Sequence, residues 1–325
     1  MKAKASAGRL RARVAALASA VASLALANAG ACRAASDLPP WGPPPPGGGL
    51  AFAVPPFDLV ADLYGDVVAP QLTIFFAGNQ FMVVPDLIGA FKRAYPQYQR
   101  VFVETLPPGK LASQIEAGAL VMGSLRIEAK PDIYTAGRTR ILALQEQKHW
   151  FAATYDYADN ELAIMVRAGN PHRVKGLSDL GRRGLRVSMP NPAFEGVARQ
   201  IEAALRRAGG EALERSVMHA KVADGSTLLT QIHHRQSPLN LLEGRADAAP
   251  VWFTESYFQQ HELHHPIETV AIPEAQNVRT TYTAAVLTAA PHPVAARDFL
   301  AFLATPTARA IYRRYAFEPP SPRSP

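Results

Sequence analysis

Residues 72–96 read LTIFFAGNQFMVVPDLIGAFKRAYP. The first six of them, Leu72–Ala77, form a short continuous apolar run, which is typical of a strand buried on both faces. Residues 78–80 (GNQ) interrupt this run, and apolar side chains then recur at helical spacing until Pro96. The stretch therefore predicts a buried strand, a tight loop and an amphipathic helix, which is the repeating unit of an α/β fold.

The same alternation continues along the chain. Further strands are expected at residues 100–104, 132–135, 161–167, 185–189, 247–253 and 281–287. Further helices are expected at residues 110–118, from about 139, and at 194–208, 294–304 and 306–315, with glycines as the stops at 118 and 209–210. Strands that alternate with helices indicate an α/β architecture with largely parallel sheets.

The composition is that of a globular protein, with 48% hydrophobic and 19% charged residues in a chain of 325. This length allows one large domain or two ordinary ones. The single cysteine, Cys32, excludes an intramolecular disulfide and a cysteine-based zinc cluster. The net charge of +7 would at first suggest a nucleic-acid or membrane-surface partner.

The N-terminal segment accounts for most of this charge. Five basic side chains precede an apolar run from Val14 to Ala27, and no acidic residue occurs before Asp37. This pattern predicts an export signal peptide over residues 1–31, with an uncleaved anchor as the alternative. Removal of the segment would lower the net charge from +7 to +2, so no nucleic-acid partner is expected.

A tether is expected between the export segment and the folded body. Residues 32–57 are rich in proline and glycine, which predicts an extended, flexible linker. Cys32 directly follows Ala29-Gly30-Ala31, which resembles a bacterial lipobox with alanine where leucine is usual. Cys32 is therefore a candidate lipid attachment point and membrane tether, and an unmodified cysteine is the alternative.

Three strand-to-helix loops are candidates for ligand binding, namely residues 78–80, 108–110 and 190–196. Such loops lie at the carboxyl ends of strands, where α/β folds bind ligands. The N–H groups of a helix N-terminus are in addition a natural site for an anion.

Motifs over residues 70–320 carry a family resemblance. In chain order they are residues 76–79 (FAGN), 108–111 with 114–115 (PGKL, QI), 131–135 (PDIYT), 160–166 with 169–171 (NELAIMV, GNP), 177–180 (LSDL), 191–192 (NP), 244–248 with 251–252 (GRADA, VW), and the closing segment 295–317. Together they resemble the molybdate/tungstate-type substrate-binding components of ABC transporters, which are type II periplasmic binding proteins.

The resemblance implies two α/β lobes that close on a ligand in a central cleft by hinge bending. Lobe 1 would hold residues 58–157 and 280–320, and lobe 2 with the hinge would hold 158–279. The two crossovers that form the hinge would lie near residues 157–160 and 277–282. The expected protein is a periplasmic, monomeric receptor without cofactor or enzymatic activity, which delivers a small oxoanion or related polar solute to an ABC permease.

The loops differ from the family pattern where the ligand is expected. Asn79 and Pro108 stand where the family uses small hydroxyl residues, and Trp252 stands in place of its site tyrosine. These differences put molybdate itself in doubt and favour a larger or different ligand. The candidate ligand-binding residues are Asn79, Gln80, Gly109, Lys110, Tyr134, Asn191, Glu195, His234 and Trp252.

Three alternatives stay open at the level of sequence. The first is a protein that binds a metal or a metal complex, with weak candidate ligands at His233, His234, His261 and His264. The second is a sensor or scaffold lipoprotein that uses the same fold without a transporter. The third and most remote is a metal-dependent hydrolase, since no GxSxG, P-loop or GxGxxG motif supports an enzyme.

Overall fold

The computed structural model describes residues 63–122, 125–231, 233 and 235–321. All of them belong to one of the chain's two units, Pro44–Pro325. The predicted signal peptide, the predicted linker with Cys32, and His234 lie outside the described residues. The described part is a mixed α/β fold in which ten strands form one continuous sheet, and the predicted α/β class is confirmed.

We divide the sheet, together with the helices that cover it, into two halves. The first half has the strand order β1-β3-β2-β6-β12-β7. Its strands are β1 (Leu63–Gly65), β2 (Leu72–Ala77), β3 (Val101–Leu106), β6 (Ile133–Gly137), β12 (Arg279–Leu287) and the beginning of β7 (Phe151–Arg167). Its helices are α2 (Val84–Ala94), α3 (Pro108–Ala117), α4 (Arg138–Lys148), α9 (Pro293–Leu303) and α10 (Pro306–Arg314). A separate hairpin joins β4 (Leu120–Met122) to β5 (Leu125–Ile127).

Helices cover both faces of the first half because its strands are apolar on both sides. Ile74 and Phe76 of β2 pack in one cluster with side chains of α2 and α9. Phe75 of β2 packs in the opposite cluster with Leu111 of α3 and Ile141 of α4. The loops that follow β2 and β3 therefore emerge at one edge of a well-packed sheet.

The second half continues from β7 in the order β10-β8-β9, with β11 on the other side of β7. Its further strands are β8 (Val187–Met189), β9 (Thr227–Leu229), β10 (Ala248–Trp252) and β11 (Ile267–Ala271). Its helices and helical turns are η2 (Leu177–Gly181), α5 (Gly196–Arg215), η3 (Ser216–Ala220), α6 (Lys221–Ala223), α7 (Gln236–Leu242), α8 (Phe253–Tyr257) and η4 (Phe258–Glu262).

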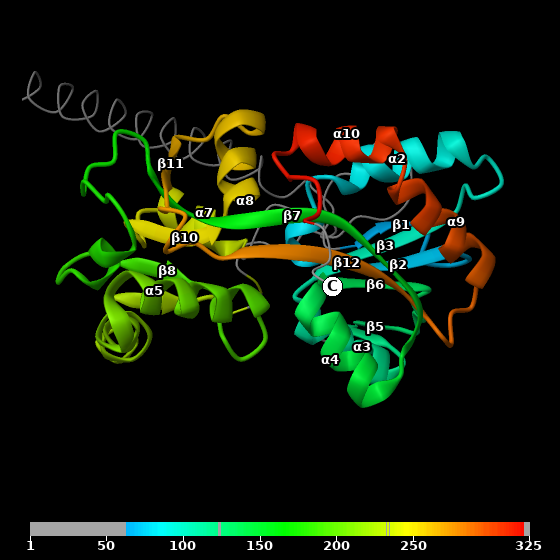
Figure 1. Cartoon of the computed structure of the whole chain (residues 1–325), viewed down its shortest axis with the longest axis horizontal. Coiled ribbons are helices and arrows are strands. Elements are labelled where there is room, and N and C mark those ends of the chain that lie inside the picture. Colours follow the sequence, from blue (N-terminus) through cyan, green and yellow to red (C-terminus); the bar gives the residue numbers. More distant parts are fainter. Residues whose placement is uncertain (1–62, 123–124, 232, 234, 322–325) are drawn as a thin grey trace, which may run out of the picture. The chain divides into compact units, whose positions relative to one another are not determined.

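Two strands connect the halves. Figure 1 shows β7 (green) and β12 (orange) running side by side from one group of strands to the other. Residues 151–161 of β7 pair with β12, whereas residues 162–167 pair with β10 and β11. The segments that the sequence suggested as crossovers thus lie against each other, with Tyr282 opposite Ala158. Hinge bending at this place stays a prediction.

Two of the differences from the sequence-based expectations concern the direction of the strands and the helix that begins at Gly196. The sheet is mixed, because β1, β7, β11 and β12 run antiparallel to their neighbours. The glycine pair at 209–210 leaves the helical conformation as expected, but the chain resumes a helix that ends at Arg215. No helix in the described ranges combines the length and the apolar character that a membrane span requires.

Candidate functional site

The loop after β2 is tied to the crossover strand β12. The η1 turn (Gly78–Gln80) follows β2 directly and is buried. Asn79 donates its amide N–H to the Tyr282 hydroxyl oxygen at 2.6 Å. Gln80 donates to the Asn79 side-chain oxygen at 3.5 Å, while its own buried Oε1 has no hydrogen-bond donor within the described part of the chain. This amide oxygen is a spare acceptor at the edge where the ligand was expected.

The first turn of α3 lies against the loop before α5 in the second half. A Cβ atom at Gly109 would come within 2.8 Å of the Phe194 carbonyl oxygen, so only glycine permits this approach. The neighbouring Lys110 places its Nζ 4.5 Å from the centre of the Phe194 ring. Burial lowers the pKa of Lys110, and the nearby carboxylate of Glu195 opposes this shift. Two of the three predicted loops therefore meet across the halves.

Asn191 and Glu195 fix the loop that precedes α5. Glu195 is buried and accepts hydrogen bonds from the Asn191 backbone N–H, at 3.0 Å, and from the Thr230 hydroxyl. The Asn191 amide donates to the Thr230 carbonyl oxygen at 3.2 Å, and its side-chain oxygen accepts from the backbone N–H of Ala193 at 3.0 Å. Both residues were expected to bind ligand, and the contacts described for them hold the loop in place.

A buried arginine crosses from the second half to the first. Arg235 is only 3% exposed, and its guanidinium donates to the Thr105 carbonyl oxygen at the end of β3, at 3.0 Å. The same nitrogen lies 3.0 Å from Nε2 of His233, and the guanidinium lies 5.0 Å from the centre of the Phe81 ring. The charge of Arg235 is thus held beside the loops that follow β2 and β3.

This arrangement can be compared with known proteins. The family model for bacterial extracellular solute-binding proteins matches residues 72–318. The chain belongs to this family. Its matched range contains every strand of the described sheet except β1, and the resemblance expected from the sequence motifs is confirmed.

Relatives of this solute-binding protein include a protein of known ligand. The molybdate-binding protein ModA of Mycobacterium tuberculosis is 26% identical over 167 residues, which are 51% of this chain and 56% of the relative. The chain thus matches little more than half the length of this relative.

Solved structures share the fold. The periplasmic molybdate-binding protein of Azotobacter vinelandii superposes with a TM-score of 0.62 at 16% identity, covering 77% of this chain and all of that chain. The sulfate-binding protein SubI of Mycobacterium tuberculosis superposes with a TM-score of 0.61 at 20% identity, covering 77% of this chain and 87% of that chain. At these identities the likeness concerns the fold, and the expected two-lobed periplasmic-binding-protein fold is confirmed.

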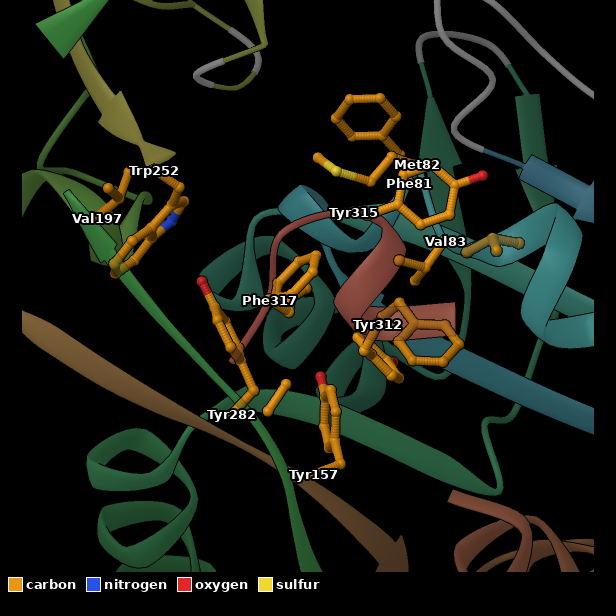
Figure 2. Packing of buried hydrophobic residues seen from close by; sticks show 14 of the residues in the cluster. Phe81, Met82, Val83, Tyr157, Val197, Trp252, Tyr282, Tyr312, Tyr315 and Phe317 are labelled. Atoms are coloured by element: carbon orange, nitrogen blue, oxygen red, sulfur yellow. The ribbon is translucent and has the colours of Figure 1, made fainter. Parts of the chain in front are cut away.

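In this solute-binding protein, aromatic side chains pack together where β7 and β12 cross from one half to the other (Figure 2). Trp252 precedes α8, is 5% exposed, and meets the Tyr282 ring edge-on at a centroid distance of 5.9 Å. Phe317 meets the other side of the Tyr282 ring at 6.2 Å. Burial raises the pKa of Tyr282 well above its ordinary value, so the hydroxyl stays protonated while it accepts from Asn79.

Tyr134, one of the candidate ligand-binding residues, lies in the core. It is fully buried on the α3 and α4 face of the sheet and stacks on Phe151 at 6.1 Å. Strand alternation explains this, because Ile133 beside it faces the opposite cluster. Its hydroxyl donates to the Pro108 carbonyl oxygen at 2.9 Å. Tyr134 therefore contributes to the candidate site indirectly, by stabilising the start of α3.

Residues at the crossover were missed because their neighbours come from distant parts of the chain. Asn160, in the middle of β7, donates to the Thr254 hydroxyl at 2.9 Å and so joins the crossover to α8. A small pocket opens beside it. The pocket is lined by Asp159, Asn160, Glu161, Phe253, Arg279, Ala316 and Glu318. Asn160 stands in one of the family motifs, which is the signal that could have singled it out.

The histidines proposed as metal ligands have other surroundings. His233 is buried against Arg235, whereas His261 is exposed and its ring lies tilted against Tyr257 at a centroid distance of 4.5 Å. His264 is also exposed. Within residues 63–122, 125–231, 233 and 235–321, no three His, Cys, Asp or Glu side chains gather closely enough to hold a metal ion.

Proposed function

We propose that this protein is an exported receptor that captures a small oxoanion between its two halves and delivers it to an ABC importer in the periplasm. The observation that carries the proposal is the placement of Arg235 and Lys110. The two cationic side chains come from opposite halves and contact Thr105 and Phe194 across the interface. Guanidinium and ammonium groups bind oxoanions by charge-assisted hydrogen bonds.

The helix termini support an anionic ligand. The close contact between Gly109 and Phe194 brings the first turn of α3 against the loop from which α5 starts. α3 has 10 residues, and the helix that begins at Gly196 has its break only at Gly209. The N–H groups and the positive dipole end of each helix favour negative charge. An oxoanion at this place would therefore receive donors from both halves.

The ligand class is wider than molybdate. Asn79 is engaged with Tyr282, and Pro108 lacks both a hydroxyl and a backbone N–H. Recognition would then depend on Arg235, whose planar fork suits carboxylate, phosphate and phosphonate groups as well as inorganic oxoanions. The named ligands of the relatives, molybdate and sulfate, belong to the same chemical class.

The proposed cycle contains no covalent step. A ligand that contacts both halves binds the closed state better than the open one, and it shifts the equilibrium toward closure. The strands β7 and β12 would bend where they pair, at Tyr282 opposite Ala158. The closed receptor is then the form that a permease would recognise.

The test is calorimetric titration of the purified mature protein with molybdate, tungstate, sulfate, phosphate and a set of small carboxylates and phosphonates. We expect Arg235→Gln to weaken binding of the best ligand by about 10- to 100-fold, the usual worth of a hydrogen bond to a charged group. Lys110→Gln, at a partly exposed position, should weaken it less and leave the fold intact. Arg245→Gln is the control, because Arg245 is exposed and pairs with Glu243 at 2.7 Å.

Two results would contradict the proposal. One is stabilisation by divalent cations alone, with no response to any oxoanion in thermal unfolding. The other is tight oxoanion binding that neither Arg235→Gln nor Lys110→Gln changes.

A further inference from the structure

A phenylalanine of the first half is enclosed by side chains of the second half. Phe81 directly follows the candidate loop at Gln80 and is 7% exposed. The ring of Phe258 meets it edge-on, with a centroid distance of 5.2 Å and an interplanar angle of 85°. The Arg235 guanidinium lies 5.0 Å from the centre of the same ring. Opening of the two halves would have to withdraw Phe81 from both contacts.

Phe258 is placed by an irregular helical segment. α8 ends at Tyr257, and the chain continues into the π-helical turn Phe258–Glu262. A π-helical turn is uncommon and often occurs at functional places. It puts Phe258 against Tyr315 of the first half as well, at a centroid distance of 6.2 Å. The ring of Phe258, in the second half, therefore contacts two rings of the first half, Phe81 and Tyr315.

An ion pair lies beside the rings. Arg314 at the end of α10 binds Asp86 of α2 at 2.9 Å and Glu262 of η4 at 3.3 Å. The Tyr315 hydroxyl donates to the same Asp86 carboxylate at 2.9 Å. Asp86 and Arg314 belong to the first half, and Glu262 belongs to the second. Arg314 is exposed and Glu262 is partly exposed, so the contribution of the Arg314–Glu262 pair is small and sensitive to salt.

We propose that Phe81, Phe258 and Tyr315, together with the Arg314–Glu262 pair, form a clasp that sets the equilibrium between the open and the closed receptor. The clasp holds the halves together through contacts of the protein itself, apart from any ligand. The part of this inference that concerns ligand affinity rests on the proposed function. The part that concerns closure does not.

The physical reason is that the clasp exists only when the halves meet. Edge-to-face aromatic pairs add to the stability that burial of the rings gives, and both contributions are lost on opening. A receptor whose closed state is populated without ligand binds more tightly, because less of the binding energy is used for closure. Loss of the Phe258 ring should then weaken binding on the order of 10-fold without removing a proposed ligand contact.

The decisive experiment measures closure in the absence of ligand. Spin labels at Glu146→Cys in α4 and Glu211→Cys in the second half, both exposed positions, report the distance between the halves in a Cys32→Ser background. We expect Phe258→Ala to move the distance distribution toward an open form. Tyr257→Ala is the matched control, because Tyr257 lies on the same segment and its ring contacts, to Phe253 and His261, stay within the second half.

The ionic component has its own matched pair. Arg314→Gln should shift the distribution in the same direction by a smaller amount, and the shift should shrink in high salt. Arg313→Gln, at the exposed neighbouring position, should leave it unchanged. A double-mutant cycle of Phe81→Ala and Phe258→Ala then tests whether the two rings act together, since independent side chains would give additive shifts.

The affinity measurement uses molybdate and sulfate as probes. Phe258→Ala should raise their Kd about 10-fold, and Phe258→Leu should recover part of the loss. If no oxoanion binds the wild-type protein, the proposed function fails while the distance measurement still decides on the clasp. A distance distribution that Phe258→Ala leaves identical to that of Tyr257→Ala would overturn the clasp itself.

Discussion

Glu104 is a carboxylic acid in an apolar place. It lies on β3, two residues after Phe102 and two residues before Leu106. Because side chains alternate along a strand, all three lie on the face that α3 and α4 cover, and Glu104 is fully buried there. Burial raises the pKa of Glu104 to about 8, although the polar side chain of Gln114 opposes the shift. Neither carboxyl oxygen has a hydrogen-bond partner among the described residues. The side chain is therefore protonated at neutral pH.

The stability of the protein should consequently fall as the pH rises. The folded form keeps the Glu104 proton up to a pH of about 8, whereas the unfolded form loses it near the ordinary pKa of 4.5. The stabilising contribution is thus complete below pH 4.5 and is lost as the pH rises through 8. We expect Glu104→Gln to remove this dependence on pH. At pH 9 the free energies of unfolding of the variant and of the wild-type protein should then differ by up to a few kcal/mol.

Urea denaturation at several pH values between 5 and 9 measures the effect of Glu104→Gln. Glu116→Gln is the matched control, because Glu116 lies on α3 as an exposed residue that pairs with Lys148. It should change the free energy of unfolding by less than about 0.5 kcal/mol at each pH. Parallel curves for wild type and Glu104→Gln would refute the role given to this proton.

Among the elements, those with a strong local pattern were predictable from the sequence. The apolar run 72–77 and the glycine stop at 118 gave the bounds of β2 and α3 almost to the residue. The first part of β7, residues 151–160, was missed because it forms no continuous apolar run. The partners of this part of the strand come from β12, at least 120 residues later, and no local pattern records such pairing.

The candidate site shows the same limit. The loops at 108–110 and 190–196 were predictable as helix starts, and they contact each other. Phe81 and Phe258 carry no local signal, since each resembles an ordinary core aromatic in the sequence. Only the fold brings them within 5.2 Å across 177 positions of chain. Residue type therefore indicated the chemistry of the site, and tertiary packing decided which side chains meet.

The meeting of α3 with the loop before α5 can be tested at Gly109. An added methyl group would lie 2.8 Å from the Phe194 carbonyl oxygen, and this backbone atom cannot move aside as a side chain can. Within α3 alone alanine is the better helix former, by about 1 kcal/mol. Gly109→Ala should therefore leave thermal stability equal or higher while it weakens oxoanion binding about 10-fold, because the halves cannot close fully.

The control for Gly109→Ala is Gly89→Ala within α2. A Cβ atom at Gly89 would meet only the flexible end of Arg93, at 3.5 Å. It should raise stability slightly and leave the Kd unchanged. Equal affinities for the two variants, measured by calorimetry, would show that the approach at Gly109 does not limit closure.

At the scale of the whole molecule, the halves share their backbone and their core. β7 is a single strand of 17 residues that takes part in pairing on both sides. One hydrophobic cluster runs from Ile74 and Phe91 of the first half through Tyr157 to Trp252 and Ile201 of the second. The end of the chain adds a bridge, in which Asp159 and Glu318 exchange backbone hydrogen bonds. Separation of the halves would break this cluster.

The two halves should therefore unfold together. Trp150 reports on the first half and Trp252 on the second, and Trp41, outside the described residues, can be replaced by phenylalanine. In that background, Trp252→Phe leaves the first-half probe and Trp150→Phe leaves the second-half probe. The fluorescence transition of each variant is compared with the circular dichroism transition of the same variant, so that the small stability change caused by the substitution affects both equally. In each variant the two transitions should coincide. A fluorescence midpoint that departs from the circular dichroism midpoint in either variant would show that the halves unfold separately. Closure would then be the docking of two independent bodies, whereas coincident transitions mean that hinge bending occurs within one cooperative unit whose shared strands limit how far it opens.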